Sequence, residues 1–486
     1  MNRTHTLRSC SAVFLRRALF VSMLPAVLAG CAKFSPDAGM TPVAARVATD
    51  LDKDVVKIRS PEEAAAVKAR VSRVLANKLT ADSAVQVALL NNRGLQAEYN
   101  ALGISETDFV EASLPPNPII GIERLVTDGQ LEIERRIVAD LLALVTLPRR
   151  REVARTQFEA AKQRAIEATF RTAAETRRAF YRAAAARQTV AFLEQARLSA
   201  DAAADLTRKL GETGASNKLE QARASAFYAE ISNELARARL QAGTEREALT
   251  RMLGLWGSDI DYKLPQALPA IRGIETAQQV EADAVRKRVD LIAARLELDA
   301  MAKSLGLTQS TRYISMLDGG LRSNYERVKE EGETEKSYPK GFELEIQIPI
   351  FDFGEVKVRR ARETYMQAVN HLLEKAVNVR SEARSAYLTY RASYDIARQY
   401  QNRILPLRKT VNDEALLRYN GMLIDVFELL TTVRESIDSN VAAIAAQRDF
   451  FIASVDFQTA IVGGGASSGE ASEGPSTSVA AGGSEH

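Results

Sequence analysis

Two acidic side chains three residues apart form the clearest candidate for a functional pair in this chain of 486 residues. They are Asp425 and Glu428, in the stretch IDVFEL. An i, i+3 spacing places both carboxylates on one face of a helix. Such a pair favours cations when it lines a passage, and it also stabilises a helix N-terminus through the helix dipole with no further role. The residues alone leave both interpretations open.

Signals for catalysis or cofactor binding are missing from the sequence. It contains no phosphate-binding loop, no GxGxxG and no GxSxG. The three histidines, His5, His371 and His486, are scattered along the chain, so we expect no zinc site. The formal net charge is +3, without the concentrated basic face that nucleic acids need. We therefore expect a protein that is not an enzyme and carries no cofactor.

The N-terminus carries a second candidate, the thiol of Cys31. Residues 1–30 begin with basic residues and continue with an apolar run, the layout of a secretory signal peptide. The end, Leu28-Ala29-Gly30-Cys31, resembles the lipobox of bacterial lipoproteins. That resemblance implies cleavage before Cys31 and attachment of diacylglycerol and an N-acyl chain, such as palmitate, to it. The alternative is a short transmembrane anchor with an incidental cysteine.

The location of Cys31 bears on export and on disulfides. Cys10 would leave with the signal, so Cys31 would be the only cysteine of the mature chain, and we expect no disulfide framework. Lys33, rather than an aspartate, stands two positions after Cys31, which favours the outer membrane over retention in the inner one.

Strand patterns occur twice. In residues 340–350 the apolar side chains alternate with polar ones: Phe342, Leu344, Ile346 and Ile348 on one side, Glu343, Glu345 and Gln347 on the other. A partner strand is expected near 312–325, with the charged loop RVKEEGETEKSYPK between the two. Earlier, PIIGIERLV and LEIERRIVADLLALVTL form another pair. Runs of 9–11 residues have the length of transmembrane β-strands. Four strands cannot close a barrel, so they must join strands of other subunits.

The rest of the chain reads as helix. Residues from Arg149 to about Leu210 contain no Pro or Gly, and sixty helical residues span roughly 90 Å. These helices are too polar for lipid. The order helix, two strands, long helix, sharp turn, long helix occurs twice, with Gly214 and Gly421 as matching breakers. We expect a signal peptide (1–30), an extended tether with a short helix (31–76), two repeats (77–253 and 275–462) joined by a connector (254–274), and a disordered tail (463–486).

Four motifs, in this order, resemble the TolC-type outer-membrane factors. They are LTADSAVQVALLNNRGLQAEY at the start of the first helix, ASLPPNP before the first strand, IPIFDFGEVKVRRARETY from strand to helix, and the Gly421 turn followed by IDVFEL. The resemblance covers about residues 77–462. It implies a mainly α fold with a small membrane β part: a homotrimer with four strands per chain, a 12-stranded β-barrel and a long antiparallel α-helical barrel in the periplasm.

The resemblance also implies roles for particular residues. Asp425 and Glu428 match acidic positions that line the periplasmic entrance, where the first repeat has Lys218 and Gln221. The turns at Gly214 and Gly421, with Met422 and Leu423, match the region that meets a periplasmic adaptor. A gating arginine expected after Gly421 is absent. In the barrel, Glu343, Glu345 and Gln347 would face the lumen, and Phe342, Leu344, Ile346 and Ile348 the lipid.

The function that follows is an exit duct of a tripartite efflux pump, anchored in the outer membrane and working with an adaptor and an inner-membrane pump. A type I secretion duct is an alternative of the same class. A periplasmic adaptor or coiled-coil scaffold without a pore is an alternative of another class. An adaptor is expected to have one helical hairpin between β-rich halves, whereas this sequence predicts two hairpins and few strands.

Overall fold

A computed structural model describes residues 34–128, 130–271, 273–274, 279–330 and 333–465. Cys31, the signal peptide and most of the low-complexity tail lie outside the described residues. The fold divides into two compact units. The first unit comprises Met1–Val74, Leu89–Ala168 and Glu281–Glu382, and the second comprises Leu75–Ala88, Thr169–Val280 and Ala383–His486. Each unit takes segments from both predicted repeats, whose boundaries stay a prediction.

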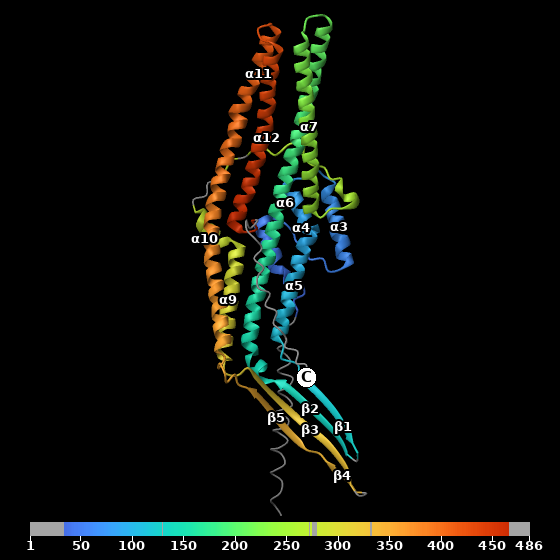
Figure 1. Ribbon diagram of the computed structural model, residues 1–486, viewed down its shortest axis with the longest axis vertical. Helices are drawn as coiled ribbons and strands as arrows, with labels where there is room; N and C mark the ends of the chain where they lie inside the picture. The colour runs from blue at the N-terminus through green and yellow to red at the C-terminus, as the bar shows by residue number, and fades with distance from the viewer. Residues whose placement is uncertain (1–33, 129, 272, 275–278, 331–332, 466–486) are drawn as a thin grey trace, which may run out of the picture. The chain divides into compact units, whose positions relative to one another are not determined.

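The first unit contains an antiparallel sheet that follows two of its helices (Figure 1). Its strands are β1 (Ile119–Thr127), β2 (Gln130–Asp140), β3 (Met316–Glu330), β4 (Glu333–Ser337) and β5 (Lys340–Gln347). β2 lies between β1 and β3, and β3 pairs with both β4 and β5 on its other side. The fourth predicted strand corresponds to β5, and the additional strand β4 is separated from it by Tyr338 and Pro339. Proline lacks the N–H that a ladder needs, which explains the interruption.

Two strand boundaries differ from the prediction. The charged stretch expected as a loop forms the end of β3 and β4 instead, because polar side chains on both faces of a hairpin do not prevent backbone pairing. In the other hairpin, LLALVTL is helical: α6 (Leu141–Glu212) begins directly after β2. Asp140 accepts a hydrogen bond from the amide of Ala143 at 2.7 Å, so this side chain caps the helix and ends the strand.

The helices of the first unit include one that the sequence reasoning missed. α2 (Met40–Leu51) lies where an extended tether was expected, and it buries Met40, Val43 and Val47 at helical spacing. α3 (Pro61–Leu75) is close to the predicted short helix. α5 (Arg93–Ser113), α8 (Val280–Lys287), α9 (Val289–Ser310) and most of α10 (Glu355–Gln399) complete the unit. Gly354, at φ +72°, precedes α10, and a Cβ there would lie 2.2 Å from the carbonyl oxygen of Arg312.

The first helix, which opens with the motif LTADSAVQVALLNNRGLQAEY, is interrupted within that motif. α4 (Ala81–Asn91) and α5 are separated by Asn92, which is extended and accepts a hydrogen bond from the amide of Leu95. α8 and α9 are separated in the same way by Arg288, at φ −64° and ψ 121°. One extended residue changes the direction of a helix. Each half of the chain therefore has a bend just before its helix α5 or α9, at Asn92 and at Arg288.

The second unit is helical in its described part. It contains most of α4, the later part of α6, α7 (Lys218–Leu253), a 3₁₀ turn η1 (Gly257–Ile260), α11 (Leu405–Asn420) and α12 (Val426–Val462). A π-helical turn, η2 (Tyr400–Ile404), links α10 to α11. It ends two positions before Pro406, whose missing N–H and bulky ring oppose a regular α-helix there. The helical path thus continues across Pro406, with a local widening.

Aliphatic and aromatic side chains from three helices hold the turn-bearing part of this unit together. They form a cluster of Leu193, Ala200, Ala224, Phe227, Ile231, Leu235, Leu430 and Ile437. Alanine at the contact positions lets the helices approach closely. Among the described helices, none combines the length and the low charge required of a membrane-crossing helix.

Candidate functional site

The strand register separates the sheet into two chemically different faces. Directly paired residues share a face, and successive residues alternate. Glu134 pairs with Glu123 on β1 and Asn324 on β3, and Glu343 and Glu345 pair with Gly320 and Asp318. The following side chains therefore lie on one face, here called the acidic face: Glu123, Glu132, Glu134, Arg136, Asp318, Arg322, Asn324, Glu326, Glu343, Glu345 and Gln347. Acids outnumber arginines on it.

Side chains on the acidic face bind one another across the strands. Arg322 pairs with Glu134 at 2.7 Å, and the amide of Asn324 donates to Glu132 at 3.1 Å. Arg136 lies over Gly121, where a Cβ would approach its guanidinium Nε to 2.8 Å. The predicted lumen residues Glu343, Glu345 and Gln347 lie on this face and are exposed. Their alternation with apolar neighbours is the signal that identified them.

The opposite face, here called the apolar face, exposes large hydrophobic side chains. Ile122 is 74% exposed, Leu321 67% and Phe342 81%. Leu344 and Ile346 belong to the same face by their pairing with Gly319 and Leu317. A patch of this extent on a protein surface marks a contact with a partner or with lipid. Ile348, the last predicted lipid-facing residue, lies beyond the end of β5 and has no place on either face.

The two helical turns of the second unit lie at the same end of that unit (Figure 1). In the first turn, Gly214 has φ +81°. Asn217 accepts a hydrogen bond from the amide of Glu220, and the Glu220 side chain accepts one from the amide of Asn217, so a complete capping box starts α7. Arg208, on the helix before this turn, pairs with Asp205 and Glu212 of the same helix.

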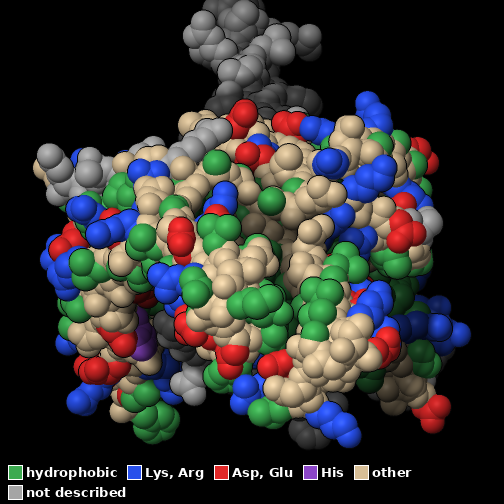
Figure 2. All heavy atoms as spheres, turned by 90° about the horizontal axis from the view of Figure 1, so that it is seen from above, with side chains coloured by type: hydrophobic (Ala, Val, Ile, Leu, Met, Phe, Trp, Pro, Cys, Tyr) green, Lys and Arg blue, Asp and Glu red, His purple; other side chains and the backbone are tan. Residues whose placement is uncertain are grey.

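The second turn departs from the expected geometry. Gly421, the matched helix breaker, has φ −82°, an ordinary value. The left-handed residue is Met422, at φ +53°. Its side chain is 93% exposed, and that of Leu423 is 76% exposed. On the face drawn in Figure 2, hydrophobic, basic and acidic side chains are interspersed, and no single kind covers it.

The candidate acids are both exposed, and one of them caps its helix. Asp425 accepts a hydrogen bond from the amide of Glu428 at 2.8 Å, so its carboxylate is the N-cap of α12. The cap geometry aligns Asp425 and Glu428 with Asn217 and Glu220 of α7, and not with the predicted Lys218 and Gln221. Lys218 is exposed. Gln221 lies over Gly211 and donates to the carbonyl of Ser216 at 3.2 Å, so it braces its own turn. Arg223 stacks on Phe427 at 4.5 Å and joins the start of α7 to that of α12.

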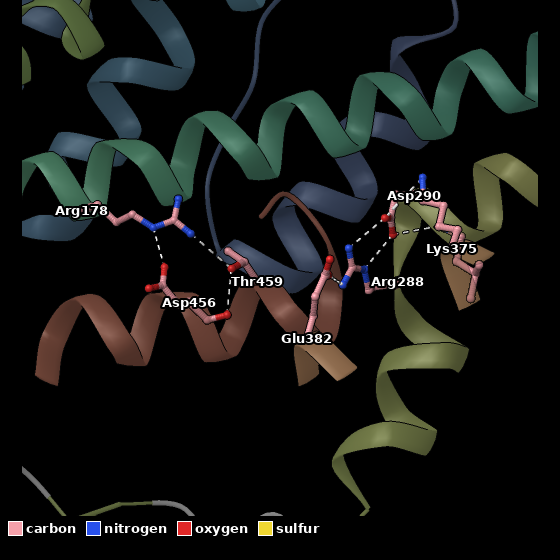
Figure 3. A network of polar contacts seen from close by, with 8 residues as sticks. Arg178, Arg288, Asp290, Lys375, Glu382, Asp456 and Thr459 are labelled. Carbon is pink, nitrogen blue, oxygen red and sulfur yellow. Dashed lines mark hydrogen bonds and ion pairs between the residues drawn. The ribbon is translucent and has the colours of Figure 1, made fainter. Parts of the chain in front are cut away.

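A buried charged network in the first unit gave no signal in the sequence (Figure 3). Arg288 binds Asp290 through two hydrogen bonds of 3.0 Å and also donates to Glu382. Lys375 approaches Asp290 at 3.5 Å. Burial opposes ionisation of Asp290, yet the hydrogen bonds and charge of Arg288, with Lys375, lower the pKa of its carboxyl. The network closes the bend between α8 and α9, which is a structural role.

The described part of the second unit contains a polar contact between α6 and α12 and a cavity. Arg178 donates to Asp456 at 2.6 Å and to Thr459 at 3.4 Å (Figure 3). A cavity of about 270 Å³ lies beside the π-helical turn, between α6, α11, α12 and the connector. Two glutamines of its wall, Gln188 and Gln447, bind the connector backbone at Leu268 and Pro269. Among the described residues, no group of His, Cys, Asp and Glu is placed to hold a metal ion.

Comparison with known proteins places the fold. No family model matches the chain, and no curated protein matches it. Solved structures do match. The outer-membrane channel OprN has a TM-score of 0.65 at 16% identity, covering 81% of this chain and 92% of its own. The CmeC outer-membrane channel of Campylobacter jejuni has 0.64 at 16%, covering 83% and 87%. The MtrE outer-membrane channel of Neisseria gonorrhoeae, in its open state, has 0.60 at 15%, covering 78% and 88%.

These matches extend over most of both chains in each comparison. At such low identity they establish the architecture and not the activity. The mainly helical fold with a small sheet is confirmed. The chain has the fold of the TolC-type outer-membrane factors, as the four sequence motifs predicted.

Proposed function

We propose that the chain is one subunit of a trimeric outer-membrane channel, the exit duct of a tripartite efflux system. The observation that carries this proposal is the two-faced sheet. One face gathers acids, and the other exposes Ile122, Leu321 and Phe342. A soluble protein would bury such an apolar face against a second layer, whereas lipid on one side and water on the other suit both faces as they are.

The free edges of the sheet support assembly from several chains. Within the described residues, β1 pairs only with β2, and β4 and β5 pair only with β3. In lipid, unpaired backbone groups are strongly unfavourable, so the two edges must meet strands of neighbouring copies. Three copies, each giving four strand positions, would form a 12-stranded barrel with the acidic face towards the lumen. The helical hairpins would extend into the periplasm, where the turns would meet an adaptor of the inner-membrane pump.

The proposal is tested by conductance. The purified full chain, added to a planar lipid bilayer, is expected to run as a trimer after chemical cross-linking and to open ion-conducting pores. Absence of pores from a trimeric preparation would contradict the channel and favour the pore-free scaffold. The type I secretion duct predicts the same pores, and a genetic test separates the two: deletion of the gene should sensitise cells to small toxic compounds rather than block secretion of a protein.

Anchoring through Cys31 belongs to the same proposal, since a lipid on the N-terminus would hold the chain at the outer membrane. The variant Cys31→Ser is expected to lose metabolic labelling with palmitate while the protein is still made. The matched variant Cys10→Ser alters the other cysteine, within the signal peptide, and should leave labelling unchanged. Labelling that persists in Cys31→Ser would show that another residue carries the lipid, and absence of labelling in the unaltered chain would favour the transmembrane anchor.

A further inference from the structure

The basic residues of the sheet are distributed unevenly between its faces. The register places six of them on the apolar face: Arg124, Arg135, Arg327, Lys329, Lys336 and Lys340. Among the sheet residues whose side chains the structure describes, no Asp or Glu lies on that face. All of these acids are on the acidic face. Random placement would mix the signs, so the apolar face combines hydrophobic surface with an unbalanced positive charge.

The six bases occupy one end of the apolar face. Nearer the helices, Ile137, Leu321 and Phe342 form an uninterrupted apolar row across β2, β3 and β5. The next row towards the hairpin ends contains Arg135 and Lys340, and two rows further Arg327 pairs directly with Lys336. Rows on one face repeat every two residues, roughly 7 Å along a strand. The face thus changes from purely apolar to basic along the strand direction.

These bases lack acidic partners in the described part of the chain. On the acidic face, by contrast, Arg322 is bound to Glu134 at 2.7 Å. Five of the six bases are exposed, and Arg327 is half-buried. Between them, Tyr325 and Tyr338 pack with ring centroids 5.2 Å apart, a hydrophobic body with polar hydroxyl groups of the kind found where lipid meets water. Neighbouring like charges repel unless an anion lies between them.

We propose that the band formed by these six bases binds the anionic, phosphate-bearing headgroups of lipids around the barrel. The inference rests on the proposed function, because only an inserted barrel turns the apolar face towards lipid. Arginine pairs with phosphate through two parallel hydrogen bonds, and lysine adds charge. The apolar rows would contact the acyl chains of the same lipids, while Arg124, Arg135, Arg327 and Lys336 reach their phosphates. A zwitterionic lipid offers no net negative charge to this band.

The test measures lipid retained by the purified full chain in neutral detergent, by native mass spectrometry, with bis-phosphorylated lipid A as the probe and phosphatidylcholine as its comparison. We expect the intact chain to retain lipid A preferentially. The quadruple variant Arg124→Gln, Arg135→Gln, Arg327→Gln, Lys336→Gln should lose roughly tenfold or more of this affinity, because several charge-assisted hydrogen bonds are removed. Arg135→Gln alone should lose part of it.

Arg136→Gln is the matched control, since it removes the same charge one residue away on the opposite face, and it should retain lipid A unchanged. Equal binding by the quadruple variant, or equal losses in Arg135→Gln and Arg136→Gln, would overturn the proposal. So would displacement of lipid A by inorganic phosphate at comparable concentration, which would indicate a general anion site. Pores in a phosphatidylcholine bilayer report on the channel separately. Their absence would refute the proposed function, and their presence without lipid A preference would refute only this inference.

Discussion

The two turns of the second unit each connect a pair of antiparallel helices, but a different residue type takes the left-handed conformation in each. In the first, the left-handed position is Gly214, and a Cβ there would meet nothing within 4 Å. In the second, the left-handed position is Met422, whose side chain is 93% exposed. A left-handed conformation is unfavourable for any residue with a Cβ. The first turn is therefore relaxed, and the second keeps an exposed apolar side chain at a conformational cost.

The flanking helices widen this difference. At the end of α6, Asp205 pairs with Arg208 and Lys209, and Arg208 also pairs with Glu212. Among the described residues, the last two turns of α11 contain no ion pair. Strain persists where the structure around it holds it or where it serves a function. The second turn has fewer stabilising contacts than the first. We infer that Met422 and the acids after it serve a function through their exposed side chains.

The largest effect is expected from removing the charge of the second turn. In the proposed trimer, Asp425→Asn with Glu428→Gln should reduce a severalfold preference for K⁺ over Cl⁻ to roughly none, because rings of acids favour cations. Asparagine still caps a helix, so the fold should be preserved. The preference is obtained from the reversal potential in a salt gradient. At the start of α7 beside the first turn, Lys218→Gln removes a positive charge and should not weaken cation preference. An unchanged reversal potential in the double variant would show that these acids only stabilise α12.

A smaller effect is expected from exchanging the left-handed residues. Met422→Gly should stabilise the second turn by about 1 kcal/mol, because glycine adopts positive φ without steric cost. Gly214→Ala should destabilise the first turn by about the same amount, although open space surrounds it. Hydrogen exchange of the first amides of α12 and α7 reports both local opening free energies. Leu423→Ala serves as a control for lost side-chain contacts. Changes of the same sign in both turns would contradict the comparison.

The left-handed residue is Met422 and not Gly421, and the sequence alone did not predict this position. Glycine marks the turn region correctly. Which residue becomes left-handed depends on which amide makes the last hydrogen bond of the helix, and here the amide of Gly421 itself donates to the carbonyl of Leu417. The start of α6 depends on a single residue in the same way. The side chain of Asp140 caps the helix there, although the apolar run after it had suggested that the strand continues. Local hydrogen bonds that compete within one or two residues leave no periodic signal.

Longer patterns were more reliable. The alternation around Glu343 and Glu345 predicted that they share a face. The strand register places Glu134 of the other hairpin on the same face, which the local sequence around either hairpin could not predict. The charge difference between the two faces depends on pairing between strands almost 200 positions apart in sequence. The short helix α2 was missed because twelve residues with three buried side chains give a weak periodicity. Stretches that alternate over many residues predict a face, whereas contacts across the fold need the structure.

The smallest expected effect concerns acid at the first turn. Hydrogen bonds from Lys209, and then from Arg208, lower the pKa of Asp205. The ion pairs therefore contribute stability above the usual aspartate pKa of about 3.9, and this contribution is lost as the pH falls through the lower pKa of the folded state. An NMR titration of the Asp205 carboxyl should give a midpoint below the usual value, and Lys209→Gln should raise it more than Arg208→Gln does. Identical midpoints in all three proteins would mean that the pairs do not persist in solution. The first turn would then lose one of the three features that distinguish it from the second, leaving the glycine and the capping box to account for any difference in local opening.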